Sequence, residues 1–355
     1  MRNTGGERVD EAVASAVALL RTATDRDWEQ VRARGLEWSC RMTAVHIAEC
    51  LVGYAGQLTG RAADGYVPFE ISLEEGTGNE GALRVIEAMG GLLSATVRTT
   101  PRDVRAFHSY PFRSANREGF AAMGIAEVLL HTHDIAHGLG LDYEPPAETV
   151  SYVLTRIFPD VRPGPAPWPT LLWATGRGEL PGRAPVTEWR WHNNLVIGGD
   201  RLTLEGITPA SAADLAVGGD GGFTWAGDGP FEGTREGAGI MVKQYEEGLL
   251  RPEWGMFALV RREDDRAVGA MGFHGPPDED GRVEIGYDLV EAARGHGFAT
   301  EALRALSAWA LAREDVTSVF ARTEPGNTAS QRVLARAGFT RVAADGEEPA
   351  YELRG

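Results

Sequence analysis

The sequence predicts a two-domain chain of the α plus α/β class, with a four-helix bundle followed by a mixed β-sheet flanked by helices. Three observations predict it. The 355 residues exceed what one ordinary hydrophobic core holds. Before residue 150 apolar residues recur at helical spacing, with few strand signals. After about residue 200 short β-prone runs alternate with helical ones.

The bundle is expected from four helical segments in the first half of the chain. Ser39 or Thr43 is a candidate cap for the second helix, and Gly138 and Gly140 end the fourth. A proline-rich break at 159–169 then follows. Four helices with few strands between them favour an antiparallel bundle. The expected helices span 9–20, 41–58, 81–98 and 116–139.

The second half should hold a sheet flanked by helices. Runs rich in β-branched and aromatic residues are separated by turn-forming stretches at 262–266 and 276–281. The domain boundary is expected near 193–200, where paired asparagines and paired glycines interrupt the pattern. The expected strands are 202–204, 257–260, 268–273, 283–289 and 318–323, and the expected helices are 290–312 and 329–337.

The composition argues against several classes of partner. A net charge of −16 argues against nucleic acid, because phosphate binding needs clustered Lys and Arg. No run approaches the roughly 18 apolar residues of a membrane span. Residues 1–10 lack the apolar core of a signal peptide. Two cysteines, Cys40 and Cys50, fit a reducing compartment. We therefore expect a cytoplasmic protein with neither nucleic-acid nor membrane partners.

A glycine-rich turn between a strand and a helix predicts an anion site. The strand at 284–289 runs into 294–300, and a helix follows at once. Backbone N–H groups and the helix dipole point at whatever occupies such a turn. Gly295 and Gly297 allow close approach of phosphate oxygens, and Arg294 can add a charge-assisted contact. Taken alone, this turn predicts only a site for an anion and does not identify the ligand.

A second segment makes the prediction more specific. Residues 323–334 read Thr-Glu-Pro-Gly-Asn-Thr-Ala-Ser-Gln-Arg-Val-Leu, and Ala337-Gly338-Phe339 follows. Together with the glycine turn, this segment resembles the GNAT acetyltransferase superfamily, closest to its RimJ/RimL-like branch. The resemblance covers roughly residues 198–355. It implies a mixed sheet flanked by helices, acetyl-CoA as coenzyme, and transfer of the acetyl group to an amine.

The same resemblance assigns parts of the coenzyme to residues. The turn would contact the pyrophosphate, and backbone groups at the splayed end of the 283–289 strand would pair with the pantetheine. Asn327 would help to hold the coenzyme, and Ser330 would approach the thioester sulfur. The predicted coenzyme-binding residues are Asp288, Leu289, Val290, Arg294, Gly295, His296, Gly297, Phe298, Ala299, Thr300, Asn327 and Ser330.

Direct attack of an amine on a thioester needs a proton acceptor. Glu284 is the candidate base, and a strand carboxylate paired with an arginine is the alternative interpretation. Many relatives place a tyrosine acid on the helix after the last core strand. Residues 327–339 contain no tyrosine, so Ser330 is the remaining catalytic candidate there. His274, at a predicted strand end, is a further candidate acid or base.

Three residues of the predicted bundle have the types and spacing of metal ligands. His46 lies on the apolar side of the second helix, and Glu127 and His131 lie four apart on one face of the fourth. Such a set is a three-ligand site with open positions. Taken separately, His46 would read as a core histidine and the Glu127–His131 pair as a surface pair.

With Trp38 upstream, this set resembles the DinB and mycothiol-dependent maleylpyruvate isomerase-like family. Further likeness lies in the segments 171–177, 180–183 and 189–191, so the resemblance covers roughly residues 8–192. It implies a divalent metal, with zinc as the default and nickel, iron or manganese as alternatives. Asp134 could orient a ligand, and Cys50 could face the site or serve as a small core residue.

Two functions of the whole chain follow from these resemblances. In one, a metal-dependent thiol transfer of the mycothiol type precedes an N-acetyltransferase acting on a small-molecule amine. In the other, the metal bundle of an N-acetyltransferase only binds or senses a ligand. A regulator that binds acyl-CoA without catalysis is a third alternative. A group of carboxylates favours a cationic acceptor, or is a solvated helix face: Glu232, Glu236, Glu246 and Glu247.

Overall fold

The computed structural model describes residues 5–101, 103–109, 113–159, 161, 165–189, 191–343 and 346–355. The chain divides into two compact units between Asn193 and Asn194. Parts of two sequence features lie outside the described residues, namely 160 and 162–164 of the proline-rich break and Arg190 of the isomerase-like segment. No helix in the described part of the chain is long and apolar enough to cross a membrane.

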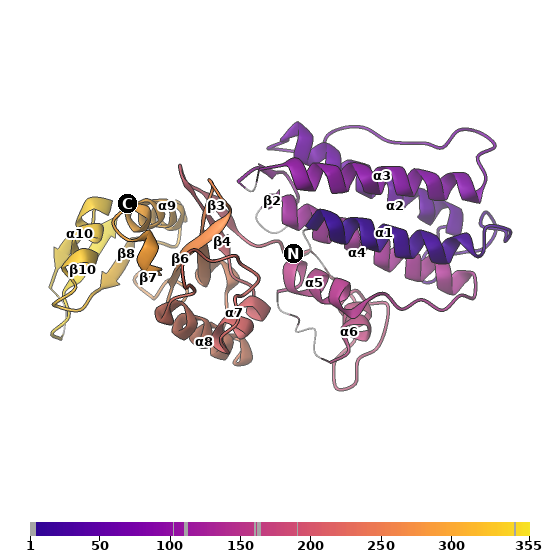
Figure 1. The fold of residues 1–355 in the computed structure, drawn as a ribbon. Coiled ribbons are helices and arrows are strands. Elements are labelled where there is room, and N and C mark those ends of the chain that lie inside the picture. Colours follow the sequence, from indigo (N-terminus) through magenta and orange to yellow (C-terminus); the bar gives the residue numbers. More distant parts are fainter. Residues whose placement is uncertain are drawn as a thin grey trace. The chain divides into compact units, whose positions relative to one another are not determined.

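Four long helices form the first unit and lie side by side (Figure 1). They are α1 (Gly5–Arg21), α2 (Cys40–Gly60), α3 (Asn79–Thr99) and α4 (Arg117–Gly138). Helices α1 and α2 each pack against both α3 and α4. Ser39 caps the start of α2 by accepting a hydrogen bond from the Met42 N–H, and Asn116 caps the start of α4 by accepting one from the Gly119 N–H. Asn116 was expected inside the helix and is its cap instead.

Shorter elements complete the first unit. The sequence patterns did not predict α5 (Ala147–Ile157), α6 (Pro167–Ala174) or the two-residue ladder of β1 (Arg105–Ala106) and β2 (Ala115–Asn116). The apolar piece 171–173 lies within α6, whose Pro167 occupies a first-turn position where its missing N–H costs nothing. Helix α5 packs on α4, and α6 packs on α5.

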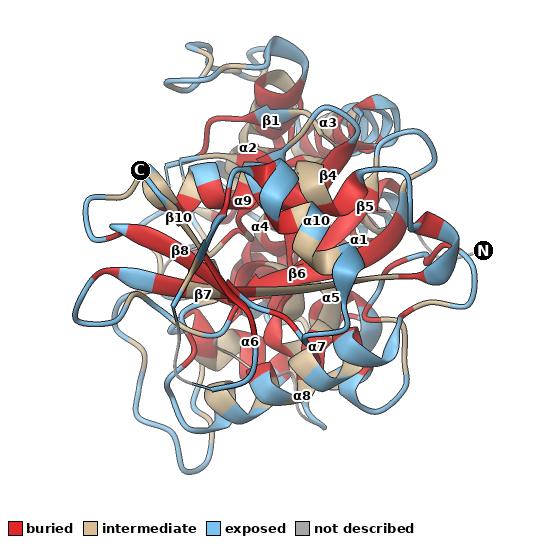
Figure 2. Cartoon of the chain, turned by 90° about the vertical axis from the view of Figure 1, so that its left-hand side faces the viewer, coloured by how far each residue is buried: buried red, intermediate tan, exposed pale blue. Residues whose placement is uncertain are grey.

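The second unit is a mixed sheet of eight strands. Their order is β3-β4-β5-β6-β7-β8-β10-β9, and every neighbouring pair is antiparallel except β7 and β8. Nearly all residues of β4 to β6 are buried (Figure 2). The bounds are β3 (Val196–Gly198), β4 (Leu202–Gly206), β5 (Met256–Arg261), β6 (Arg266–Phe273), β7 (Arg282–Leu289), β8 (Ser318–Arg322), β9 (Thr340–Val342) and β10 (Ala350–Arg354).

Helices cover both faces of this sheet (Figure 1). Helices α7 (Pro209–Ala216) and α8 (Glu232–Glu246) pack together, and α8 contacts β5, β6 and β7. Helix α9 (Phe298–Leu311) contacts β3, β4, β7 and β8, and α10 (Thr328–Ala337) packs on α9. Short 3₁₀ turns occupy Pro252–Trp254 and Glu291–Ala293. The helix expected at 290–312 therefore begins only at Phe298, after the glycine turn.

Two adjacent glycines of α3, Gly90 and Gly91, allow a test of how α3 packs on α1. A methyl group on the buried Gly90 would lie 2.8 Å from a γ-carbon of Val13 on α1, whereas one on the exposed Gly91 would meet nothing within 4 Å. We expect Gly91→Ala to stabilise the fold by ~0.5–1 kcal/mol through helix propensity. We expect Gly90→Ala to destabilise it by ~1–3 kcal/mol through overpacking. Urea unfolding followed by circular dichroism measures both, and equal shifts would contradict the packing of α1 on α3.

Candidate functional sites

Strand β7 leaves its parallel neighbour halfway along its length. Only Arg282–Glu284 pair with Ser318–Phe320 of β8, whereas on its other edge β7 pairs with β6 up to Leu289. The remaining backbone groups on the β8 side of β7 therefore have no strand partner. Extended backbone offers N–H and C=O groups in a row, so this opening can receive an extended chain with amide groups of its own.

The direction of the backbone selects which residues face the opening. Val290 donates its backbone N–H to the Val268 carbonyl of β6 at 3.0 Å, so its backbone groups face β6 and not the opening. Backbone N–H and C=O groups alternate in direction along a strand. The backbone groups of Asp288 therefore also face β6, whereas those of Leu289 face the opening. Val290 was predicted to pair with pantetheine through its backbone, and its N–H is not available for that. The Leu289 carbonyl accepts from Arg294 Nε at 3.2 Å, which leaves the Leu289 N–H.

The glycine turn follows directly and ends at the start of α9. Gly295 and Gly297 have φ of +80° and +81°, a region that favours glycine. The first hydrogen bond of the helix runs from the Glu301 N–H to the Gly297 carbonyl at 3.1 Å. The N–H groups of Phe298, Ala299 and Thr300 therefore have no partner within the helix, and they sit at its positive end. The turn has the geometry of an anion site.

A second cation, which no pattern in the sequence indicates, lies beside this turn. Arg201, in the loop before β4, donates through Nη1 to the His296 carbonyl and through Nε to Glu301, both at 2.9 Å. Its guanidinium also stacks 4.7 Å from the centre of the Phe298 ring. Arg294 stacks similarly on Phe231, at 4.8 Å. Nothing local in the sequence links Arg201 to a turn 95 residues away.

The predicted residues of α10 meet a tyrosine that comes from the sheet. The Asn327 side-chain oxygen caps the helix by accepting the Ser330 N–H at 3.0 Å. The Ser330 hydroxyl lies 2.8 Å from the Tyr287 hydroxyl of β7. Burial raises the pKa of Tyr287 despite this hydrogen bond. The sheet thus supplies a phenol beside α10, a helix that contains no tyrosine of its own.

The candidate base Glu284 has two charged neighbours. Its carboxylate lies 3.6 Å from His274 Nδ1 and 3.8 Å from Arg322 Nε. The carboxylate therefore pairs with an arginine, as one interpretation of the sequence expects, and it also adjoins His274; its role as a base stays a prediction. His274 is mostly exposed, with 63% of its side chain accessible. The His274 side of this pair is therefore open to solvent.

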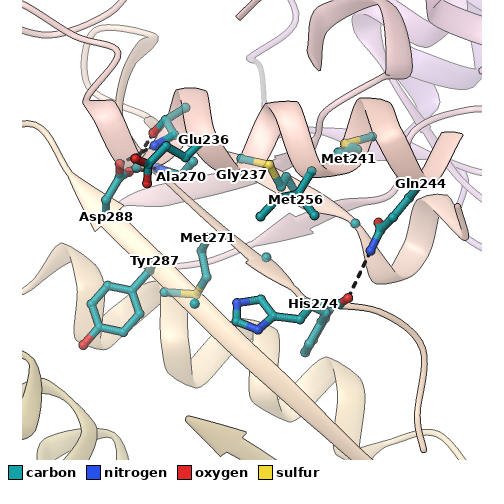
Figure 3. A pocket seen from close by; sticks show the side chains of 17 residues that line it. Glu236, Gly237, Met241, Gln244, Met256, Ala270, Met271, His274, Tyr287 and Asp288 are labelled. Carbon is teal, nitrogen blue, oxygen red and sulfur yellow. Dashed lines mark hydrogen bonds between the residues drawn. The ribbon is translucent and has the colours of Figure 1, made fainter. Parts of the chain in front are cut away.

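A cavity of about 240 Å³ lies between α8 and the strands β6 and β7, and His274 forms part of its wall (Figure 3). The Asp288 carboxylate lines it and accepts hydrogen bonds from the Thr234 N–H at 2.6 Å and the Thr234 hydroxyl at 2.7 Å. Burial raises the pKa of Asp288. The other principal side chains of the wall are Ile240, Met241, Met256, Met271, Phe273, Glu236, Gln244 and Tyr287.

Part of the second unit matches a family of known proteins. Residues 201–340 match the family model described as "Acetyltransferase (GNAT) domain". These residues are a GNAT acetyltransferase domain. The N-acetyltransferase YjdG of Bacillus subtilis, itself uncharacterized, is 41% identical over 81 residues, which cover 23% of this chain and 48% of the relative. The N-acetyltransferase p20 of Bacillus licheniformis is 32% identical over 99 residues, covering 28% and 56%.

The chain thus spans about half the length of these two curated relatives. Solved structures to which the chain is similar include a GNAT-family acetyltransferase of Bacillus anthracis, with TM-score 0.32, 18% identity, and coverage of 45% of this chain and 98% of that one. Another is RimL, a ribosomal L7/L12 α-N-protein acetyltransferase in complex with coenzyme A, with TM-score 0.34, 18% identity and the same coverage.

The first unit brings its three predicted ligands together. Ligand atoms of His46, Glu127 and His131 all lie within 4.8 Å of one another. His131 Nε2 is 3.2 Å from the Glu127 carboxylate, and the rings of His46 and His131 are 5.1 Å apart. Trp38 stacks edge-on against His46 at 4.9 Å. Helices α2 and α4 therefore place two imidazoles and one carboxylate around a common point.

The surroundings of this cluster suit a metal. Asp134 lies 3.2 Å from His131 Nδ1, which fixes the ring so that Nε2 faces Glu127. Asp134 is itself held by Arg177 at 3.0 Å. Two imidazole nitrogens and a carboxylate oxygen are the donor set of many zinc sites, with an oriented second partner on the histidine. The residues present therefore fit a divalent ion such as zinc.

Charges within the cluster stabilise one another. Burial alone would lower the pKa of His131, but hydrogen bonds to Asp134 and Glu127 raise it to about 9. Burial would raise the pKa of Glu127, yet the hydrogen bonds from His131 and from the Tyr54 hydroxyl lower it. Burial raises the pKa of the Cys50 thiol well above its usual value, and Glu127 adds to this. Without an ion, the cluster is a set of paired charges.

The pairing of Asp134 predicts a stability effect. Its carboxylate is 2% exposed and holds both Arg177 and His131, so Asp134→Asn would leave a largely buried guanidinium without its counter-ion. We expect a loss of about 3 kcal/mol in the free energy of unfolding. Asp10→Asn is the control, because its partner Arg98 and Asp10 itself are both about half exposed, and we expect a loss below ~1 kcal/mol. Denaturant unfolding measures the two, and equal losses would contradict a buried network.

Proposed function

We propose that the protein transfers the acetyl group of acetyl-CoA to a primary amine. The observation that carries the proposal is the open edge of β7 running directly into a glycine turn with unpaired N–H groups, within a GNAT domain. The open edge can bind an extended chain with amide groups, and the adjoining turn can bind an anion. Coenzyme A offers these two groups in this order, as its pantetheine arm and its pyrophosphate. The relatives YjdG and p20 carry the same assignment of N-acetyltransferase in their names.

In this proposal each part of the coenzyme has its residues. The Leu289 N–H pairs with pantetheine, and the turn from Arg294 to Thr300 holds the pyrophosphate. Arg201 adds positive charge beside the turn. Asn327 orients the start of α10 through its capping bond, so that Ser330 faces β7. The anion is bound by backbone dipoles and guanidinium groups together, which is how helix N-termini bind phosphates.

The chemistry needs one proton to leave the amine and one to reach sulfur. The amine nitrogen attacks the thioester carbonyl carbon, the carbon–sulfur bond breaks, and coenzyme A leaves as the thiolate. We assign Glu284 with His274 as the route by which the amine proton passes to water. We assign the Tyr287 hydroxyl, hydrogen-bonded to Ser330, as the donor to the thiolate, with solvent restoring its proton. Because burial raises the pKa of Tyr287, the phenol keeps its proton at neutral pH until the thiolate forms beside it.

The acceptor binds in the cavity beside α8 in this proposal. Its wall is mainly apolar, with Met241, Met256 and Met271 among its side chains, and its two carboxylates are Glu236 and Asp288. Neither a lysine nor an arginine is among the residues that line it in the described chain. A small amine with an apolar body therefore fits the cavity better than an acceptor that carries a phosphate or carboxylate.

Turnover of the purified full chain tests the proposal. Acetyl-CoA is offered with a panel of small amines, and free coenzyme A is measured with a thiol reagent. We expect release that depends on the amine, together with a product that carries one acetyl group. If acetyl-CoA binds but no amine of the panel causes release of coenzyme A, the result would instead favour a regulator that binds acyl-CoA without catalysis. Failure to bind acetyl-CoA would overturn the proposal.

Arg294 predicts the strength of coenzyme binding. We expect Arg294→Ala to weaken acetyl-CoA about tenfold or more, because charge-assisted hydrogen bonds contribute ~1.5–3 kcal/mol. Isothermal titration calorimetry measures the affinity. Lys243→Ala is the matched control, since Lys243 is a cation on α8 with 75% of its side chain exposed. An unchanged affinity in Arg294→Ala, or an equal loss in the control, would exclude the turn as the pyrophosphate site.

The role assigned to Tyr287 predicts that its loss slows the chemical step and leaves coenzyme binding intact. We expect Tyr287→Phe to lower kcat about 100-fold, the scale of general acid catalysis, and to leave the affinity for acetyl-CoA within about twofold. Tyr351→Phe on β10 is the control, because it also removes a buried phenol hydroxyl from this sheet. Steady-state kinetics and calorimetry separate the two effects. A wild-type kcat in Tyr287→Phe would remove this residue from the proton route.

For the first unit we propose a divalent-metal module like that of the DinB and maleylpyruvate isomerase-like family. The supporting observation is the convergence of His46, Glu127 and His131 on one point, with Asp134 orienting His131. A bound ion would supply a Lewis acid able to hold a thiolate of a low-molecular-weight thiol. Thiol transfer and a purely binding role are the two alternatives for this module.

The metal module predicts a response to chelation that is confined to the first unit. We expect treatment with a chelator to lower the melting temperature of the helical unit, because ligand binding to the native state stabilises it. Zinc should restore the melting temperature in wild type but not in His46→Ala. Acetyl-CoA affinity, measured in parallel, should stay unchanged. A chelator with no effect on a protein that contains no metal by elemental analysis would contradict the module.

A further inference from the structure

A carboxylate of strand β7 caps the helix that lies beside it. The capping position of α8 is Phe231, whose side chain accepts no hydrogen bond from the N–H groups of the first turn. The Asp288 carboxylate supplies the missing acceptor from the sheet. Its Oδ2 accepts the Thr234 N–H at 2.6 Å, and its Oδ1 accepts the Thr234 hydroxyl at 2.7 Å. The start of α8 is thus held by a residue that follows 54 positions later in the chain.

The carboxylate is itself fixed to the neighbouring strand. Asp288 Oδ1 also accepts the Ala270 N–H of β6 at 3.3 Å, so this side chain joins β6, β7 and α8 at one point. Figure 3 shows Asp288 pointing towards the first turn of α8. A β-carbon added to Gly233 would lie 2.9 Å from Asp288 Oδ2. The helix therefore approaches the carboxylate as closely as a glycine permits.

Helix α8 needs support from outside because its own sequence is a weak helix former. Its glycines at 233, 237 and 239 lower its intrinsic helix propensity. Towards its other end, the Gln244 side chain donates a single exposed hydrogen bond to the His274 carbonyl at 3.1 Å. The part of α8 between these two attachments forms one wall of the cavity, through Glu236, Gly237, Ile240 and Met241.

We infer that Asp288 is a positioning residue, which holds the α8 wall of the acceptor cavity against the strand that binds the coenzyme. The inference rests on the proposed function, because that proposal assigns the cavity to the amine. On β7 the Leu289 N–H faces the opening assigned to pantetheine, whereas the neighbouring Asp288 carboxylate faces α8. None of the residues assigned to the coenzyme or to the proton route lies on α8. Loss of the carboxylate should therefore weaken amine binding and leave coenzyme binding intact.

Steady-state kinetics of the full chain test the inference, with acetyl-CoA and with benzylamine or isopentylamine, both small amines with apolar bodies. We expect Asp288→Ala to raise KM for the amine about tenfold or more, because a hydrogen-bonded charge that holds the wall is lost. We expect kcat to change less than about threefold, since no proton-transfer group is removed. The affinity for acetyl-CoA, measured by calorimetry, should stay within about twofold of wild type. Asp288→Asn keeps an oxygen that can accept the Thr234 N–H, and it should restore most of the lost KM.

Backbone amide exchange measures the same attachment without any ligand. We expect exchange at 234–241 to be about tenfold faster or more in Asp288→Ala, because the first turn of α8 loses its cap, while α9 stays unchanged. Thr234→Val removes only the hydroxyl bond to the carboxylate. It should move KM and exchange in the same direction by a smaller factor, and it replaces Asp288→Ala if that variant folds poorly.

Asp264→Ala is the matched control. Asp264 also accepts a backbone N–H, that of Arg266 at 3.3 Å, but it lies in the turn at the opposite end of the β5–β6 hairpin from the cavity. Its removal should change neither KM nor the exchange of α8. A wild-type KM in Asp288→Ala, even with a lowered melting temperature, or an equal rise in Asp264→Ala, would overturn the inference.

Failure of the proposed function gives a different result. If wild type releases no coenzyme A with either amine, that result counts against the proposed function. Exchange then decides the inference by itself, and unchanged exchange at 234–241 in Asp288→Ala would overturn it.

Discussion

The divergence of β7 from β8 is the constraint on which the second unit depends. Backbone N–H and C=O groups inside a protein are almost always paired, so an interior strand that loses its neighbour after three residues needs another partner. The surrounding elements are arranged around this opening. The glycine turn closes one end of it, α10 faces it with Ser330, and the cavity beside α8 adjoins the same strand from the opposite face. An extended coenzyme would complete the sheet rather than merely sit on it.

The first unit depends on a different kind of pairing. Glu127, His131, Asp134 and Arg177 form a chain of alternating charges through the side of a helical core. Such a network contributes little if it is compared with a well-packed apolar core, but the loss of one member is costly. The network ends at Glu127 and His131, where the candidate ligand atoms of His46, Glu127 and His131 converge. A bound metal ion at this end would account for charged groups in a helical core.

Local patterns predicted the parts of the sites that depend on neighbours in sequence. The glycine turn follows from Arg294 to Thr300 alone, and the ligand pair of α4 follows from its four-residue spacing. For helix α8 the sequence indicated only a helix face that carries carboxylates and no bounds, because the glycines at 233, 237 and 239 weaken helical propensity. Strand β9, with three residues, is too short for an alternating pattern to be distinctive.

Features that depend on tertiary contacts could not be predicted. The orientation of Val290 is set by its register with β6, which no single-strand pattern contains. Tyr287 meets Ser330 only because β7 and α10 come together across 43 residues of sequence. Arg201 reaches its turn across 95 residues.

Backbone hydrogen exchange tests the central claim most directly, because it reports the unpaired amide groups themselves. Exchange of the full chain is compared with and without coenzyme A, at peptide resolution or finer. We predict that binding slows exchange at Leu289 and at Phe298–Thr300, and leaves β5 and the helices of the first unit unchanged. Coenzyme A that binds while exchange at those four residues stays the same would contradict the account.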